Sequence, residues 1–204
     1  MSIAYDRPVS PAPARTSNDA IVAAARRILE ADGLEAVTMR AVADAVGVRG
    51  PSLYKRVPDR AALIRAVADG VIDDLARTMS RAVETGEPRR DVTAAVNAFR
   101  DFVRANPGGY RLLFADLPTD ALPDADRVAA LGEPIVMAMS GLVGEEWALV
   151  AARTVVAWAH GFVTVELAGA FRLGGELDAA YAFGIESILR GIEAAGVNGA
   201  ASPA

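Results

Sequence analysis

Three hydrophilic side chains around residue 55 are spaced so that they point away from the protein together. Leu53 and Val57 are the residues of this stretch that are expected to face inward. Ser52, Lys55 and Arg56 are then left on the outer side of a short helix. Hydroxyl, ammonium and guanidinium groups donate hydrogen bonds, and two of the three carry positive charge. This surface is suited to a polyanion.

A tight turn precedes the helix and must hold it in place. Thr38 is expected to cap a first short helix that begins at Met39. Val42 and Val46 form the apolar side of that helix, and Gly47 tolerates the positive φ angle at which the chain reverses. The second helix, of about seven residues, buries too little surface to be stable alone. Two short helices joined in this way form a helix-turn-helix, the shape that fits a DNA major groove.

The same region carries a recognisable combination of motifs. Gly47-Val48 is followed by the run Pro51-Ser52-Leu53-Tyr54 and then by Asp59-Arg60-Ala-Ala-Leu63-Ile64. In this combination residues 38–60 resemble the DNA-binding domain of tetracycline-repressor-type (TetR family) transcription regulators, and the resemblance extends over residues 17–75. It implies an all-α fold with a helical C-terminal domain for effector binding and dimerisation.

A second resemblance lies near the C-terminus. The run Trp158-Ala-His160-Gly161-Phe162 is followed by Glu166 and, five residues later, by Phe171. This pattern is similar to the Trp-His-Gly signature of one C-terminal domain type in the TetR family. The two resemblances together cover most of the chain.

The resemblance implies which polar residues contact DNA. The bases are expected to be contacted by Arg49, Gly50, Pro51, Ser52, Lys55 and Arg56. The phosphates are expected to be contacted by Thr38, Arg40, Tyr54 and Arg60. Arginine and lysine donate to O6 and N7 of guanine, and a proline ring can contact a thymine methyl. Plain solvent exposure is the competing interpretation for each of these side chains.

Charge is distributed unevenly along the 204 residues, which carry a formal net charge of −5. Residues 1–65 hold ten basic and seven acidic side chains, a net charge of +3, which leaves −8 for the remainder. Phosphate neutralisation supplies much of the affinity of proteins for DNA, and an acidic second domain would be repelled from the duplex. The alternative is an ordinary acidic protein with an uneven charge distribution.

Few residues are suited to catalysis or metal binding. The sequence contains one histidine and no cysteine, which excludes disulfides and cysteine nucleophiles. It has no glycine-rich phosphate loop and no metal-ligand cluster, so we expect no cofactor, no metal and no enzymatic activity. The absence of cysteine fits a reducing cytoplasm.

Residues 148–171 are rich in Ala, Val, Trp and Phe, a composition that a membrane-spanning segment could also have. Arg153, His160 and Glu166 interrupt this stretch, and charged residues at bilayer depth are costly. Residues 1–16 contain three prolines and no apolar run, so they are not expected to act as a secretory signal. We therefore predict no membrane partner and a cytoplasmic protein.

The periodicity of apolar residues predicts helices throughout and hardly any strand. Residues 17–62 are expected to form the DNA-binding domain, with a connecting helix over 59–83, and residues 63–196 the C-terminal domain. Residues 1–16 are expected to be a disordered arm and 197–204 a disordered tail. One helical region is predicted over 124–142, weakened by Gly132 and Pro134, and two helices over 145–172 and 177–194.

The last two helices have wide apolar stripes. Such pairs commonly form a four-helix dimer interface in proteins that resemble this family, and a two-fold operator calls for a dimer. The interface residues predicted on the last helix are Tyr181, Ile185, Ile188 and Ile192. The alternative is that these residues are buried within their own subunit.

An effector pocket is predicted in the C-terminal half, with a small, largely apolar or aromatic guest. Its predicted lining is Phe99, Phe102, Tyr110, Phe114, Met137, Met139, Trp158, His160 and Phe162. Trp158 and His160 are two positions apart, about 200° around a helix, so they face different sides. His160 is either a structural residue held by one partner or a ligand contact. Effector binding is expected to release a homodimeric repressor from a pseudo-palindromic operator on double-stranded DNA.

Overall fold

The computed structural model describes residues 17–83 and 86–199, and it confirms the all-α fold. Within these two stretches the chain forms helices and turns, with no strand. Ten α-helices are described: α1 (Asn18–Asp32), α2 (Met39–Val46), α3 (Gly50–Tyr54), α4 (Arg60–Ala82), α5 (Pro88–Ala105), α6 (Pro107–Leu112), α7 (Ala125–Ala130), α8 (Glu133–Val143), α9 (Glu145–Leu167) and α10 (Leu177–Gly199). Two short 3-10 helices are η1 (Leu34–Ala36) and η2 (Thr119–Ala121).

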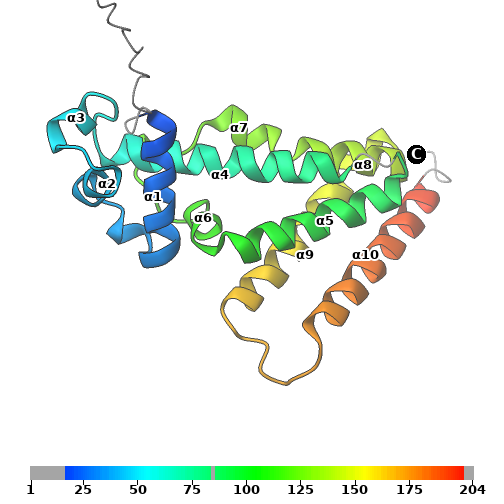
Figure 1. Cartoon of the computed structure of the whole chain (residues 1–204). Coiled ribbons are helices and arrows are strands. Elements are labelled where there is room, and N and C mark those ends of the chain that lie inside the picture. Colours follow the sequence, from blue (N-terminus) through cyan, green and yellow to red (C-terminus); the bar gives the residue numbers. More distant parts are fainter. Residues whose placement is uncertain (1–16, 84–85, 200–204) are drawn as a thin grey trace, which may run out of the picture.

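The long helix α4 joins a small helical unit to a larger one. Helices α1, α2 and α3 gather around the first turns of α4 at one end of the molecule, and α5 to α10 make up the remainder (Figure 1). The buried side of α4 carries Leu63, Val67, Val71 and Leu75. One apolar core therefore runs along α4 from the small unit into the larger one. The helix crosses the predicted domain boundary at residue 62 without a break.

Several predicted elements have different ends in the structure. The helical region predicted over 124–142 is divided into α7 and α8. Gly132 precedes α8 and Pro134 lies in its first turn, where proline cannot continue a preceding helix. Helix α9 ends at Leu167, earlier than predicted, and Gly169 beyond it has a φ angle of +61°. Helix α10 extends to Gly199, past the predicted end. The predicted arm over 1–16 and the tail residues 200–204 lie outside the described residues.

Helix α6 rests on α1 and gives the two units a second contact. The carboxylate of Glu30 accepts hydrogen bonds from the backbone N–H groups of Gly108 (2.6 Å) and Gly109 (2.8 Å). A Cβ atom on Gly108 would lie 2.9 Å from the carbonyl oxygen of Leu29, so the helices approach this closely only with glycine there. Arg26 of α1 adds a hydrogen bond of 2.8 Å to the side chain of Asn106.

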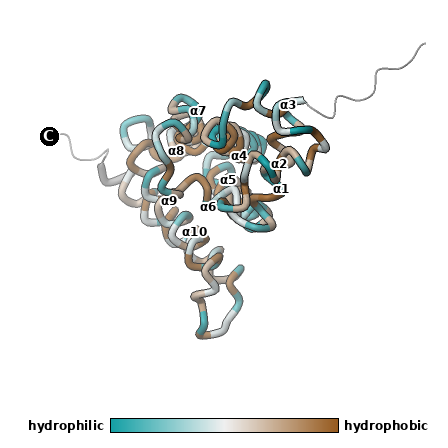
Figure 2. The backbone as a smooth tube through the Cα atoms, turned by 90° about the vertical axis from the view of Figure 1, so that its left-hand side faces the viewer, coloured by the Kyte–Doolittle hydropathy of each residue, from teal (hydrophilic) through white to brown (hydrophobic). Residues whose placement is uncertain are grey.

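Helix α9 has the length and apolar composition of a membrane-spanning helix. Core helices of water-soluble proteins can have the same length and composition. In this structure α9 packs against α5, α8 and α10, and its Glu166 forms ion pairs with Arg100 and Arg104 of α5. The hairpin of α9 and α10 ends in a connection that projects away from the other helices (Figure 2).

Candidate nucleic-acid interface and apolar cavity

The turn between α2 and α3 forms as the sequence predicted. The hydroxyl of Thr38 accepts a hydrogen bond of 3.1 Å from the N–H of Ala41, which caps α2. Gly47 ends α2 with a φ angle of +70°, in the left-handed region. The N–H of Val48 then donates to the carbonyl of Ala43 at 3.0 Å, so the reversed chain is tied back to α2.

Helix α3 presents its hydrophilic residues to solvent. Leu53 is fully buried and Val57 is buried, whereas Ser52, Lys55 and Arg56 are exposed. This is the orientation that the spacing predicted. Helix α3 is shorter than expected, however, and Lys55 and Arg56 lie in the turn that follows it. Pro58 gives a physical reason, because the residue before a proline is disfavoured in helical conformation.

Arg49, Gly50 and Pro51 form the start of α3. Arg49 is the N-terminal cap residue, it is exposed, and its side chain forms no capping hydrogen bond. Pro51 lies in the first turn, where its missing N–H costs nothing. These residues and the exposed set of Ser52, Lys55 and Arg56 therefore form one continuous surface at the end of the molecule.

Three of the four predicted phosphate contacts remain accessible. Thr38 and Arg40 are exposed, and Tyr54 is 53% exposed. Arg40 is only 3.9 Å from Asp44 in an exposed pair, an interaction that contributes little and leaves the guanidinium available.

The guanidinium of Arg60 makes two hydrogen bonds within the protein. Its Nε donates to the carbonyl of Val37 at 2.8 Å, and an Nη donates to the carbonyl of Leu34 at the same distance. Arg60 thereby holds the segment between α1 and α2 against the start of α4. This bracing contact was not predicted; the Arg60 side chain is still 40% exposed, and its phosphate contact stays a prediction.

An apolar cavity of about 250 Å³ lies in the larger unit. Its walls come from five helices: Leu75 and Met79 of α4, Val96 and Phe99 of α5, Val128 of α7, Leu131 and Gly132 after it, Ile135 of α8, and Val156 and Ala159 of α9. No charged or hydrogen-bonding side chain is among these residues. Since α4 supplies part of the wall, a guest in the cavity would touch the helix that leads to the DNA-binding unit.

Only one of the predicted pocket residues, Phe99, belongs to the wall of this cavity. Phe102 and Met139 are buried in the helix packing, whereas Phe114 and Met137 are 63% and 70% exposed. Met137 and Met139 are two positions apart on α8, so they point to opposite sides of the helix. The prediction of a single pocket is therefore wrong for these four residues. The other predicted residues, Tyr110, His160, Trp158 and Phe162, form two separate clusters.

The first cluster contains the single histidine. The hydroxyl of Tyr110 lies 2.5 Å from Nδ1 of His160, and the ring of Phe114 lies 4.3 Å from the His160 ring. The Thr164 hydroxyl donates to the carbonyl of His160 at 2.8 Å and lies 3.3 Å from the Tyr110 hydroxyl. Burial raises the pKa of Tyr110. His160 is thus held by a partner in α6, which links α9 to the helix that rests on α1.

The second cluster surrounds Tyr181 of α10. The ring of Trp158 stacks on Tyr181 with centroids 5.0 Å apart, and Phe162 meets it edge-on at 4.9 Å. The Tyr181 hydroxyl donates to the carbonyl of Val96 at 2.8 Å. A Cβ atom on Gly184 would lie 2.3 Å from the Trp158 ring, so the tryptophan packs there only against glycine. These contacts fix α10 against α5 and α9.

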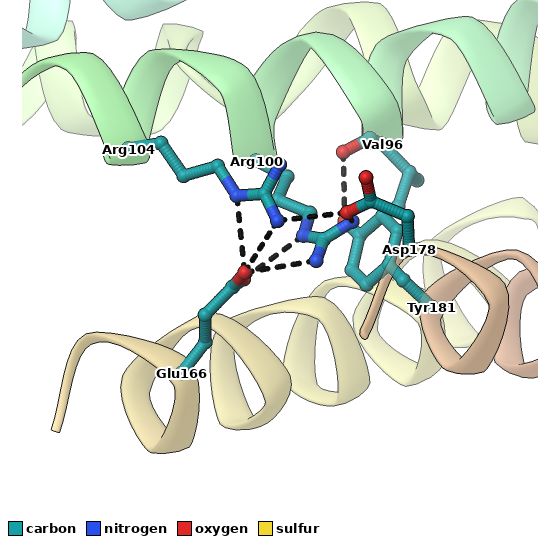
Figure 3. Close-up of polar contacts among 6 residues, drawn as sticks. All are labelled: Val96, Arg100, Arg104, Glu166, Asp178 and Tyr181. Carbon is teal, nitrogen blue, oxygen red and sulfur yellow. Dashed lines mark hydrogen bonds and ion pairs between the residues drawn. The ribbon is translucent and has the colours of Figure 1, made fainter. Parts of the chain in front are cut away.

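An ion cluster reinforces the same junction, as Figure 3 shows. Arg100, which is buried, donates two hydrogen bonds of 2.9 and 2.8 Å to the carboxylate of Glu166. Arg104 donates to Glu166 at 2.6 Å and to Asp178 at 2.8 Å. The Arg100 guanidinium also lies 4.3 Å from the centre of the Tyr181 ring, a cation–π contact.

Electrostatics in this cluster favour the ionised carboxylate. Burial pushes the pKa of Glu166 upward, but hydrogen bonds and charges from Arg100 and Arg104 together outweigh it, so the pKa is lowered. The hydrogen bond from Arg104 is the main cause of the lowered pKa of Asp178. Burial raises the pKa of Tyr181 strongly. The cluster is therefore a structural ion network.

Tyr181 and Ile185, two predicted dimer contacts, are buried inside their own subunit. Ile188 and Ile192 are partly buried against the same core. That prediction is wrong for Tyr181 and Ile185, because the stripe on α10 packs on α5 and α9. The opposite side of the hairpin is exposed and made of small and apolar residues: Val150, Thr154, Ala157, Gly161 and Val165 of α9, and Ala180, Phe183, Ser187 and Gly191 of α10. We call this surface the outer hairpin face.

Sequence reasoning missed the residues whose partners are distant in the chain. Arg100 and Glu166 are 66 positions apart, and Glu30 is 78 positions from Gly108. For Arg100 a signal was present, because an arginine on the apolar side of α5 calls for an anionic partner. For Glu30 on α1 no local pattern marked the contact.

The fold and the solvent-facing side chains of α3 define a helix-turn-helix DNA-binding regulator. Family profiles agree with this assignment. One described as "Bacterial regulatory proteins, tetR family" matches residues 21–67, and one described as "Tetracyclin repressor-like, C-terminal domain" matches residues 92–188. The chain belongs to the TetR family of bacterial transcription regulators. The Trp-His-Gly subtype stays a prediction.

Two relatives are transcription regulators. The uncharacterized HTH-type transcriptional regulator Rv0681 of Mycobacterium tuberculosis is 36% identical over 163 residues, which cover 77% of this chain and 73% of the relative. The HTH-type transcriptional activator FasR of Mycolicibacterium smegmatis is 34% identical over 95 residues, 46% of this chain and 43% of the relative. These relatives are regulators and are not described as enzymes.

Solved structures share the fold. A protein of unknown function from Rhodococcus sp. RHA1 has a TM-score of 0.75 at 23% identity, covering 91% of this chain and 98% of that one. A TetR variant from Acinetobacter baumannii AYE, in complex with minocycline, has a TM-score of 0.65 at 24% identity, covering 87% and 97%.

Proposed function

We propose that the protein is a homodimeric repressor that acts in the cytoplasm and leaves its operator when a small, largely apolar effector binds. The observation that carries the proposal is the exposure of Ser52, Lys55 and Arg56 beside the fully buried Leu53. A short helix that is anchored on one side and hydrophilic on the other matches the geometry of a recognition helix in the major groove.

A dimer is supported by the outer hairpin face. Val150, Val165 and Phe183 on this face are 53%, 38% and 75% exposed, which is unusual for large apolar side chains of one surface. Ala157 and Gly161 between them allow a neighbouring helix to approach closely. A two-fold pairing of α9 and α10 would form a four-helix interface and would place two copies of α3 on one duplex.

Repression requires that both copies of α3 reach their half-sites at once. Half-sites one turn of B-DNA apart are separated by roughly 34 Å. A small tilt of α4 would change the separation of the two recognition helices and so weaken binding. An effector produces this shift only by binding the misaligned state more tightly, with a coupling of about 1 to 3 kcal/mol.

The apolar cavity supports the effector part of the proposal. It offers about 250 Å³ and has walls on α4, α5, α7, α8 and α9. The A. baumannii TetR variant described above binds minocycline. We propose that an apolar compound occupies the cavity here and pushes on the α4 residues Leu75 and Met79.

A gel-shift assay tests the DNA-binding assignment. The DNA upstream of the protein's own gene is titrated with the wild type and with Lys55→Ala plus Arg56→Ala. We expect the double variant to bind at least about tenfold more weakly, because two cations near the phosphates and bases are lost. The dependence of affinity on salt concentration should also become shallower, because two positive charges close to the polyanion are lost.

The control is Arg81→Ala plus Arg172→Ala, which removes the same charge from exposed positions elsewhere. It should bind DNA like the wild type. Equal binding by the Lys55 and Arg56 double variant and the wild type would remove the assignment of the DNA-contacting surface.

Activation of transcription is the alternative, since FasR, a relative over 95 residues, is described as an activator. Deletion of the gene distinguishes the two: transcription from the bound promoter should rise for a repressor and fall for an activator.

A further inference from the structure

We propose that the effector is a small amphiphile with a carboxylate at one end, with its hydrocarbon part in the apolar cavity and its carboxylate on α9 between Arg153 and His160. The inference rests on the proposed effector-responsive function and names the chemical class of the effector.

The cavity itself selects the hydrocarbon part. A cavity of 150 Å³ takes up benzene, so one of about 250 Å³ accommodates about ten non-hydrogen atoms. No lining side chain can form a hydrogen bond, and a polar group buried without a partner is strongly disfavoured. Any polar group of the effector must therefore remain at the opening.

The opening lies between α7 and α9. Val128 of α7 and Val156 of α9 line the cavity and are 49% and 45% exposed. The other large lining side chains are buried or partly buried. A guest that is longer than the cavity would emerge beside these two valines.

The α9 side of the opening carries the cationic group. Arg153 precedes Val156 by three positions and His160 follows it by four, so the three side chains share one side of the helix. Arg153 is exposed and forms no ion pair or hydrogen bond with any residue in the described stretches. On the other side of the opening, Arg127 is paired with Asp73 and Glu133 is exposed. An anionic head group is therefore favoured on α9 and disfavoured beside α8.

His160 offers a second nitrogen on the same side of α9. Its Nδ1 is engaged by the Tyr110 hydroxyl, and its Nε2 has no hydrogen-bond partner among the described residues. A guanidinium and an imidazole N–H can both donate to one carboxylate.

The test measures binding of three ligands with the same eight-carbon chain to the full-length protein: octanoate, octan-1-ol and octylammonium. Calorimetry should show octanoate binding about tenfold more tightly than octan-1-ol, and octylammonium most weakly. In Arg153→Gln the affinity for octanoate should fall to that for octan-1-ol, which should itself stay unchanged. Arg172→Gln, an exposed arginine beyond α9, is the matched control and should bind all three like the wild type.

A second variant tests the location. Ala159→Leu fills the cavity and should abolish binding of all three ligands while its melting temperature and DNA binding stay near those of the wild type. If the wild type and Arg153→Gln each bind all three ligands equally, the carboxylate part of the inference is refuted. The proposal of an apolar effector would still stand. Unchanged octanoate binding in Ala159→Leu would overturn the location. If no eight-carbon ligand binds, the inference fails; if no hydrophobic compound raises the melting temperature or releases DNA, the proposed effector response fails as well.

Discussion

Glu166 shows how much one side chain contributes at the junction of three helices. Its carboxylate accepts hydrogen bonds from Arg100 and Arg104, and both guanidiniums also form ion pairs with the exposed Asp178. Because Arg100 is buried, its charge depends on a nearby anion. Removal of the negative charge from Glu166 leaves that cation with the solvent-exposed Asp178 as its remaining anionic partner.

We predict that Glu166→Gln lowers the free energy of unfolding by about 2 kcal/mol at neutral pH, less than for a fully buried pair because Arg104 is exposed. Folding lowers the pKa of Glu166, so its stabilisation is complete above the pKa in the unfolded chain and is lost as the pH falls through the folded-state pKa. The wild type should therefore lose more stability on acidification below about pH 5 than the variant does. Denaturant unfolding at several pH values measures both effects. Glu176→Gln, at an exposed position, is the control, and equal losses in the two variants would contradict the assigned role.

The sequence predicted individual residues well where the deciding contacts were local. Leu53 and Val57 face inward because of helix spacing, and Thr38 and Gly47 lie at the ends of α2 as their chemistry favours. The backbone contacts of Arg60 were not predicted, because its partners lie 23 and 26 positions earlier and no local pattern marks them.

At the scale of elements, the hairpin of α9 and α10 has one side packed inside its own subunit and one side exposed to solvent. Apolar periodicity predicted that both helices carry wide stripes, but it could not tell which part of a stripe faces inward. The stacking of Tyr181 on Trp158 of α9 and its hydrogen bond to Val96 of α5 decide this, together with the ion pair of Arg100 with Glu166. The cavity could not be predicted for a similar reason. Its walls come from five helices, and the sequence of a single helix does not specify how it packs against the others.

We predict that Gly161→Leu converts the protein to a monomer, as measured by sedimentation equilibrium. A Cβ atom on Gly161 would meet nothing within 4 Å inside the subunit, so the variant should fold normally. Across a helix pair in close contact, the same side chain would clash. Met137→Leu, a change at an exposed position of α8, should keep the wild-type assembly state. A dimer that persists in Gly161→Leu would exclude the outer hairpin face as the interface.

At the scale of the whole molecule, two structures connect the DNA-binding unit to the rest. One is α4, which is continuous across the boundary, and the other is the contact of α6 with Glu30 of α1. His160 extends the second connection, because it binds Tyr110 in α6. Both the cavity wall and the histidine cluster therefore lead to the same small unit.

We predict that Gly108→Ala lowers the melting temperature, corresponding to a loss of about 1 to 3 kcal/mol. The added Cβ would lie 2.8 Å from a Glu30 carboxylate oxygen and 2.9 Å from the Leu29 carbonyl, so α6 and α1 must separate. Gly70→Ala on α4 is the control, because its Cβ would meet Val22 at an ordinary 3.9 Å. That change should raise stability by about 0.5 to 1 kcal/mol, since alanine is the better helix former. Thermal unfolding of both variants measures the difference, and no loss in Gly108→Ala would show that the junction yields easily.

The bond from Glu30 to the first turn of α6 has an evolutionary consequence. Glu30 lies outside the proposed DNA-contacting surface and outside the wall of the apolar cavity, so its replacement should alter how tightly α6 is coupled to α1 while sparing both. Selection for variants whose DNA binding responds more weakly or more strongly to an effector should therefore recover substitutions on the side of α1 that contacts α6.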